Sequence, residues 1–260
     1  MKAIILAAGV SSRIHQLTQG LPKCLLRFGE KTILDFQIEN LFAAGVKNIG
    51  IVVGHGKQHI IEHLETNHPD KMSLITIIEN PLYASTNNIY SLWMAREWIG
   101  GDGFICLNAD VFCHSAILPP AVNTTADISM IIDREWRDET MKVIIEGDRV
   151  VRMSKSIPRE QASGTYVNIT TFSPRICNAF FEEMEAVING GDVKIFYNVA
   201  VERLIAKGVA VAYTDTNGLP WAEIDTPEDF WFAQSHVFPK ISADFQEAAR
   251  DSAVVDSDQA

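Results

Sequence analysis

The sequence contains no long hydrophobic run and only four cysteines among its 260 residues. Its apolar runs, such as residues 49–53 and 209–213, are far shorter than the roughly 20 residues of a membrane-spanning helix. The chain begins with an apolar strand that leads into a glycine turn, whereas a signal peptide has a longer apolar stretch and a small-residue cleavage site. The cysteines form no CxxC pair, so the common zinc and dithiol motifs are excluded. We therefore expect a cytoplasmic protein with reduced, buried thiols and no membrane partner.

Basic residues are in deficit, with 22 Lys and Arg against 33 Asp and Glu and a formal net charge of −11. A protein that binds the nucleic-acid backbone needs clustered Lys and Arg to displace counterions, and the sequence has no such cluster. We therefore expect no nucleic-acid partner. An anionic substrate would have to be held by a few local cations or by a metal ion, against the field of the whole protein.

Short β-branched runs alternate with amphipathic stretches through the first half of the chain. This alternation predicts an α/β fold, a Rossmann-like three-layer αβα sandwich with a mostly parallel mixed central sheet. In such a sheet the ligand crevice lies at the carboxyl ends of the strands. The expected strands are residues 2–6, 48–53, 74–78 and 104–107, and the expected helices are residues 32–44, 58–66 and 87–98.

The second half of the chain is less regular. From about residue 241 the sequence is rich in Ala, Asp, Ser and Gln, so we predict a single domain over residues 1–240 and a mobile C-terminal tail over residues 241–260. The expected strands are residues 128–133, 142–146, 150–153, 165–172 and 209–213, and the expected helices are residues 174–189 and 199–207.

A glycine-containing loop follows the first expected strand and reads Leu-Ala-Ala-Gly-Val-Ser-Ser-Arg over residues 6–13. Its small residues allow backbone N–H groups to approach a ligand, and N–H groups at the start of a helix favour an anion. Arg13 adds a planar fork of donors, and Lys23 adds a point charge within reach of the same loop. A tight turn with two surface cations explains the same residues equally well.

Acidic residues occur at two places where a ligand crevice is expected. Asp110 ends an apolar strand, and Glu223 and Asp225 precede a helix that begins near Pro227. Each has an ordinary alternative, because Asp110 could be a turn residue and Asp225 could cap the following helix.

The loop ending in Arg13, with Leu-Pro-Lys23 and an apolar strand after it, resembles the signature of the nucleotidyltransferase superfamily that makes nucleotide sugars and CDP-alcohols. The resemblance implies that the loop wraps a nucleotide and that Arg13 and Lys23 bind its phosphates. Ser11 stands where many members have a second glycine, a change that we interpret as tolerable. The nucleotide-binding residues implied are Leu6, Ala8, Gly9, Ser11, Ser12, Arg13 and Lys23.

Members of the same superfamily carry an aspartate after the fourth strand and a late E-x-D motif, which together hold Mg²⁺. The resemblance therefore implies that Asp110 and Asp225 are metal ligands and that Glu223 is a candidate third ligand. Oxygen ligands suit Mg²⁺, which needs only one or two carboxylates. The implied catalytic set is Arg13, Lys23, Asp110 and Asp225.

Residues 83–92 resemble the Tyr-x-x-x-Asn-Asn-x-Tyr-Ser-Leu string of the phosphocholine and 2-aminoethylphosphonate cytidylyltransferases. The segment lacks the glutamine and Gly-Thr-Ala string of sugar-nucleotide members. The resemblance implies transfer of CMP from CTP to a small phosphate or phosphonate metabolite, with release of pyrophosphate. It divides the domain into a nucleotide-binding half (1–112) and an acceptor-binding half (113–240). Ser85, Thr86 and Asn87 are further nucleotide-binding candidates, and capping of the next helix is their ordinary alternative.

The sequence leaves the acceptor open between 2-aminoethylphosphonate and phosphocholine. Lys142 and Lys155 offer cations for a phosphoryl group. An ammonium group could be surrounded by Trp136, Asp192 and the run Phe196-Tyr197-Asn198, because ammonium groups favour aromatic faces and a carboxylate. The phosphocholine branch has a tryptophan near Thr140 and Met141, and its absence favours a primary amine. A sugar-1-phosphate or inositol-1-phosphate nucleotidyltransferase is the alternative function. The sequence leaves the oligomeric state open, with a homodimer as one candidate.

Three histidines, His55, His59 and His63, are spaced at i, i+4 and i+8, which could place them on one helix face as a zinc site. His55 lies between two glycines, and no acidic or cysteine partner completes a familiar motif. We therefore expect an ordinary surface helix rather than a metal site.

Overall fold

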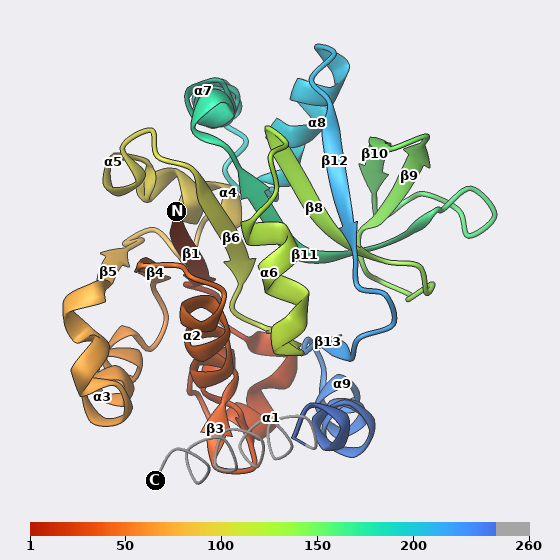
Figure 1. Cartoon of the computed structure of the whole chain (residues 1–260). Coiled ribbons are helices and arrows are strands. Elements are labelled where there is room, and N and C mark those ends of the chain that lie inside the picture. Colours follow the sequence, from red (N-terminus) through yellow and green to blue (C-terminus); the bar gives the residue numbers. More distant parts are fainter. Residues whose placement is uncertain (243–260) are drawn as a thin grey trace, which may run out of the picture.

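The computed structural model describes residues 1–242, in which a nine-stranded mixed sheet runs through the chain (Figure 1). The first half contributes four neighbouring parallel strands, in the order β5 (Ile75–Glu79), β4 (Asn48–Val53), β1 (Lys2–Ala7) and β6 (Phe104–Asn108). The sheet continues with β11 (Gly164–Phe172), β8 (Ile128–Asp133), β12 (Val211–Asp215), β10 (Arg149–Ser154) and β9 (Lys142–Glu146). In this second half the neighbours are antiparallel except for β8 and β12. The predicted mixed α/β sheet is confirmed. Parallel pairing predominates only in the first half, because the second half is built largely from antiparallel neighbours, so the sheet as a whole is evenly mixed rather than mostly parallel.

Helices cover both faces of the sheet and make the three predicted layers (Figure 1). Side chains alternate along β1, because Ala3 and Ile5 enter one core and Ile4 and Leu6 enter the other. The first core is covered by α2 (Ile33–Ala43), α3 (Lys57–Asn67) and α6 (Leu118–Val122). The second core is covered by α4 (Asn88–Met94), α7 (Pro174–Asn189) and α8 (Asn198–Ala206). The helix predicted over residues 87–98 is interrupted at Ala95, after which α5 (Arg96–Ile99) begins.

A third apolar cluster joins the beginning of the chain to its later part. Phe28 of β2 (Arg27–Phe28) stacks on Phe112 of β7 (Val111–Cys113) at a centroid distance of 4.3 Å. Strand β7 pairs with β13 (Trp221–Glu223), and α9 (Pro227–Phe232) follows. Ile241 is buried in this cluster, so the packed chain extends beyond the predicted start of the tail at residue 241. The rest of the predicted tail, from residue 243, lies outside the described residues.

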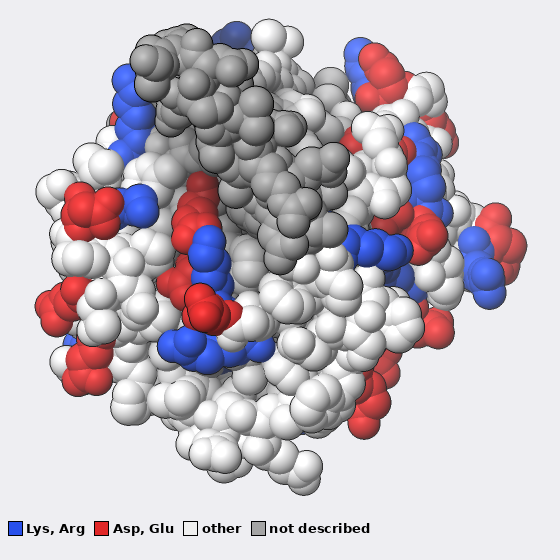
Figure 2. Space-filling view, turned by 60° about the horizontal axis from the view of Figure 1, so that its bottom comes forward, with Lys and Arg blue, Asp and Glu red and all other residues white. Residues whose placement is uncertain are grey.

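The structure agrees with the expected thiol chemistry. Each of the four cysteines is buried and free, and burial raises the pKa of Cys24 and of Cys113 to about 12. Among residues 1–242, no helix combines the length and the apolar character needed to cross a bilayer. On the face shown in Figure 2, Lys and Arg side chains are interspersed with Asp and Glu and form no continuous basic surface.

Replacement of Phe112 by alanine should lower the free energy of unfolding by about 3–5 kcal/mol, the usual cost of a cavity left by a buried phenylalanine. Phe112 is fully buried and contacts the rings of both Phe28 and Phe36. Urea unfolding followed by circular dichroism measures the change. Phe232→Ala is the matched control, because Phe232 is 52% exposed and its loss should cost only about 0.5 kcal/mol. Equal losses in the two variants would contradict the assignment of the third cluster as a core.

Candidate active site

A cavity of about 450 Å³ lies at the carboxyl ends of β1 and β6, where the parallel half of the sheet predicts a ligand crevice. The loop after β1 forms one wall, and the segment before α4 forms another. A third wall comes from the second half of the chain, with Lys155 after β10, Asn168 in β11 and Asn198 at the start of α8. The cavity therefore lies between the two predicted halves of the domain.

The loop after β1 has a backbone conformation that explains its unusual serine. Ser11 has φ 57° and ψ 34°, in the left-handed region that favours glycine. Its hydroxyl accepts a hydrogen bond from the backbone N–H of Lys23 at 3.3 Å. Serine thus adopts the conformation usually given to glycine and also ties the loop to the segment that carries Lys23.

Lys23 lies between two carboxylates that come from distant parts of the chain. Its Nζ is 3.0 Å from Asp110 Oδ2 and 2.6 Å from Asp225 Oδ1, and Arg13 Nη2 is 2.9 Å from Asp225 Oδ2. Burial lowers the pKa of Lys23, but the charges of Asp110 and Asp225 outweigh it and raise that pKa above its ordinary value. Burial likewise raises the pKa of Asp225, but Lys23 and Arg13 outweigh it and lower that pKa. Lys23 and Asp225 are therefore both charged near neutral pH.

Asp110 is held in place through the backbone on either side of it. The buried side-chain amide of Gln37, in α2, donates to the carbonyls of Asn108 at 2.8 Å and Val111 at 2.9 Å. The carbonyl of Asp110 itself accepts from the N–H of Ile224 at 3.0 Å. Helix α2 and the residue that follows β13 therefore fix the turn that presents the Asp110 carboxylate.

Asp225 is held by the start of α9. The carboxylate of Asp229 accepts hydrogen bonds from the backbone N–H groups of Asp225 at 3.0 Å and Thr226 at 2.8 Å, and Thr226 caps the helix. The residue that caps α9 is thus Thr226, and the side chain of Asp225 remains directed toward Lys23 and Arg13.

The three acidic residues proposed to bind a metal converge in space. The carboxylate oxygens of Asp110, Glu223 and Asp225 lie within 4.8 Å of one another. Asp110 Oδ1 and Asn108 Oδ1 are buried and have no hydrogen-bond partner among the described residues, so both are available to a cation. An all-oxygen donor set of this kind fits Mg²⁺. Binding of Mg²⁺ stays a prediction, and the arrangement of the oxygen donors is compatible with it.

Most of the predicted nucleotide-binding residues lie around the cavity. Ser85 is the exception: its hydroxyl donates to the carbonyl of Leu82 at 3.2 Å, and it lines neither the cavity nor its recess. Asn87 caps α4, since its side chain accepts from the N–H of Asn88, and it also lines the cavity. Leu6 and Ala8 line an adjoining recess, while Gly9, Ser11, Ser12, Arg13, Lys23, Thr86 and Asn87 line the cavity itself.

The structure corrects most of the predicted acceptor-binding residues. Lys155 lines the cavity. Lys142 is instead buried, with its Nζ 4.6 Å from the ring centroid of Trp136. Asp192 is exposed outside the cavity, and the buried hydroxyl of Tyr197 is 2.7 Å from that of Tyr166. These three side chains therefore do not line the cavity.

The cavity wall from the second half of the chain contains two residues that were expected beside an ammonium group, Phe196 and Asn198, and one that was not predicted, Asn168. Phe196 and Asn198 line the cavity on either side of the buried Tyr197, because the chain enters α8 at this point and adjacent side chains diverge. Asn168 adopts φ 61° at an irregularity in the pairing of β11 with β8. The N-N-x-Y string already contained the signal for one further lining residue, Asn88.

Comparison with known proteins identifies related sequences and structures. The sequence profile of the nucleotidyl transferase family matches residues 2–238. A CTP:phosphoglutamine cytidylyltransferase from Campylobacter jejuni is 24% identical over 253 residues, which cover 88% of this chain and 97% of that enzyme. A choline-phosphate cytidylyltransferase from Streptococcus pneumoniae is 36% identical over 97 residues, covering 37% of this chain and 40% of that enzyme. The chain spans 51% of the length of each of two longer bifunctional relatives.

A solved structure confirms the fold. The inositol-1-phosphate CTP transferase from T. maritima superposes with a TM-score of 0.78 at 20% identity, over 93% of this chain and 94% of that one. The likeness extends across both halves of the chain, so the parallel and antiparallel parts of the sheet belong to one shared architecture.

Glu223→Gln should stabilise the metal-free protein at pH 8. Burial, followed by the charges of Asp110 and Asp225, raises the pKa of Glu223 from 4.5 to about 8. Between these values the folded chain holds a proton that the unfolded chain has released, so stability falls as pH rises. One pKa unit corresponds to about 1.4 kcal/mol, and we expect the variant to gain at least that at pH 8 and little at pH 4. Urea unfolding in the presence of a chelator measures the change in the free energy of unfolding. An equal gain at both pH values would contradict the raised pKa of Glu223.

Proposed function

Because the chain belongs to the nucleotidyl transferase family, we propose that it transfers CMP from CTP to a small phosphate or phosphonate metabolite and releases pyrophosphate. The observation that carries this proposal is the convergence of Arg13 and Lys23 with Asp110 and Asp225 beside the loop after β1. Support for CTP comes from the cytidylyltransferases among the relatives and from the N-N-x-Y-S-L string of residues 87–92.

The proposed reaction needs charge control more than proton transfer. A phosphate or phosphonate oxygen attacks the α-phosphorus of CTP, a new P–O bond forms, and the bond to the pyrophosphate oxygen breaks as pyrophosphate leaves with the electron pair. A phosphate acceptor is largely dianionic near neutral pH, since its second pKa is about 6. Two unit charges 4 Å apart repel by about 4 kcal/mol at an effective dielectric of 20. Arg13 and Lys23 would offset that repulsion and align the reacting groups.

A magnesium ion would be held by Asp110 and Asp225, with Glu223 as a further ligand. When bound, it would supply positive charge to the phosphate oxygens and to the leaving pyrophosphate. In its absence, Lys23 and Arg13 balance the two aspartates and keep the carboxylates in place.

The acceptor is proposed to bind at the wall formed by the second half of the chain. Lys155 is the cation of this wall among the described lining residues, and its Nζ lies 5.3 Å from the ring centroid of Phe196. We assign Lys155 to the phosphoryl group of the acceptor. The amide oxygen of Asn198 is buried without a hydrogen-bond partner in the described chain, so it can accept from a donor on the acceptor. This polar wall suits the primary amine of 2-aminoethylphosphonate better than the methylated amine of phosphocholine.

A sugar-1-phosphate or inositol-1-phosphate nucleotidyltransferase is the alternative, since the T. maritima structure shares the fold. A matrix of four nucleotides against 2-aminoethylphosphonate, phosphocholine, phosphoethanolamine, inositol 1-phosphate and hexose 1-phosphates tests both proposals by pyrophosphate release. CTP with 2-aminoethylphosphonate should have the highest kcat/KM. Equal use of CTP, UTP and ATP would reject the cytidylyltransferase assignment, and preference for a cyclic alcohol phosphate would establish the alternative.

Replacement of Lys23 by alanine should lower kcat/KM by about 100-fold or more, the usual effect of removing one preorganised charge stabiliser. Asp110→Ala should abolish turnover, while both variants remain folded by circular dichroism. Lys57→Ala is the matched control, because Lys57 pairs with Glu79 at 2.8 Å away from the cavity. Its pyrophosphate release should equal that of the wild type. A normal rate in Asp110→Ala would remove Asp110 from the proposed metal site.

A further inference from the structure

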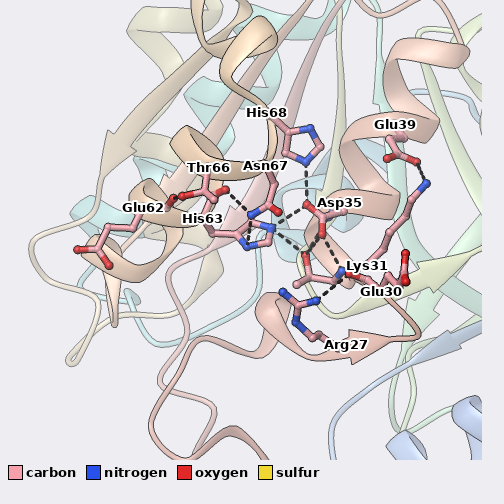
Figure 3. A network of polar contacts seen from close by, with 11 residues as sticks. Arg27, Glu30, Lys31, Asp35, Glu39, Glu62, His63, Thr66, Asn67 and His68 are labelled. Carbon is pink, nitrogen blue, oxygen red and sulfur yellow. Dashed lines mark hydrogen bonds and ion pairs between the residues drawn. The ribbon is translucent and has the colours of Figure 1, made fainter.

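A second cluster of potential metal ligands lies apart from the cavity, at the start of α2 (Figure 3). His63 Nε2 and His68 Nε2 are each 2.7 Å from the same oxygen, Asp35 Oδ1. Asp35 lies in the first turn of α2, His63 on α3, and His68 where α3 ends. The cluster does not correspond to the histidine spacing in the sequence. His55 contacts the carbonyl of Gly20, and His59 is exposed.

We propose that Asp35, His63 and His68 form a binding site for a first-row transition metal, with Zn²⁺ as the best fit. Two imidazole nitrogens and one carboxylate oxygen are a donor set that suits Zn²⁺, with water as a fourth ligand. Ligand atoms of tetrahedral Zn²⁺ are about 2.0–2.1 Å from the metal and so about 3.3 Å apart. Each Nε2 would therefore move away from Asp35 Oδ1 by roughly half an ångström, which side-chain rotation can provide.

The second carboxylate oxygen of Asp35 is already fixed. Asp35 Oδ2 accepts hydrogen bonds from the N–H of Thr32 at 2.7 Å and from its hydroxyl at 2.8 Å, as part of the capping box of α2. The carboxylate is therefore oriented with Oδ1 toward the two imidazoles.

Both imidazoles can present a free lone pair at Nε2. A neutral histidine does so when its proton is on Nδ1. His63 Nδ1 is 3.1 Å from the side-chain nitrogen of Asn67, which also donates to the backbone carbonyl of His63 at 2.8 Å. A proton on Nδ1 would require this amide to turn, offering its oxygen to that proton and giving up the bond to the carbonyl. His68 Nδ1 is buried and has no hydrogen-bond partner among the described residues, so moving its proton from Nε2 to Nδ1 breaks no bond at Nδ1. The side chain of His63 is 10% exposed, which leaves one edge of the cluster open to solvent.

The chemistry of this cluster differs from that of the active site. The cluster of Asp110, Glu223 and Asp225 offers only oxygen and suits Mg²⁺, whereas imidazole nitrogen selects transition metals. Excess Mg²⁺ can therefore occupy the oxygen cluster without filling the site at Asp35. The proposal is also independent of the proposed enzymatic activity, because it concerns residues outside the cavity.

Titration of the full, untagged chain with Co²⁺ in excess Mg²⁺ tests the proposal, because Co²⁺ bound by nitrogen and oxygen has visible d–d absorption bands. The wild type should bind one equivalent, and one equivalent of Zn²⁺ should displace it. His63→Gln should weaken binding by more than about 100-fold, beyond the 10–100-fold expected from losing only an outer hydrogen-bond partner. His59→Gln, on the same helix but exposed, should bind as the wild type does.

Two further measurements separate a metal site from a hydrogen-bond network. Zn²⁺ should raise the unfolding midpoint of the wild type in a concentration-dependent way and leave that of His63→Gln unchanged. Asp110→Asn should retain the bound Co²⁺, which places the site away from the active site. Absence of stoichiometric Co²⁺ binding to the wild type, or wild-type affinity in a folded His63→Gln variant, would overturn the proposal and leave a hydrogen-bonded capping network.

Discussion

The ion pairs of Lys23 are the interaction on which the candidate active site depends. This ammonium group contacts Asp110 and Asp225, which lie 87 and 202 residues away in the sequence. Without a cation between them, the two carboxylates would repel each other at a distance where such repulsion costs several kcal/mol. The pair forms only when the loop after β1, the turn after β6 and the segment after β13 are all in place. The site therefore forms only when these distant segments of the domain are folded together.

The apolar and polar contacts around this site act together. The stack of Phe28 on Phe112 lies next to the segment that carries Lys23 and to the turn that carries Asp110. Gln37 bridges that turn from the opposite side through two backbone carbonyls. The same helix begins with the Thr32–Asp35 capping box, to which His63 and His68 are joined. A metal ion at Asp35 would thus stiffen the start of the helix that positions Asp110.

Local sequence patterns predicted those site residues that can each be recognised within one short segment. Arg13, Lys23, Asp110 and Asp225 each follow a recognisable strand or loop pattern, and the structure brings them together. The cavity wall from the second half of the chain was predicted only in part. Lys142 in β9 and Lys155 just after β10 are similar cationic candidates in the sequence, but of the two only Lys155 lines the cavity, and the local pattern does not show which side chain faces it. The contact between Asp35 and His68 was also beyond sequence reasoning, because it joins the first turn of one helix to the end of another.

The net charge of the chain gives a last reason for a divalent ion in the active site. In the proposed reaction Arg13 and Lys23 would face a triphosphate with several negative charges, yet both are already paired with aspartates. Lys155, on the cavity wall formed by the second half of the chain, adds only one further positive charge. For the proposed reaction, a protein with a net charge of −11 would therefore need further positive charge at its carboxylates to gather two anions in one cavity.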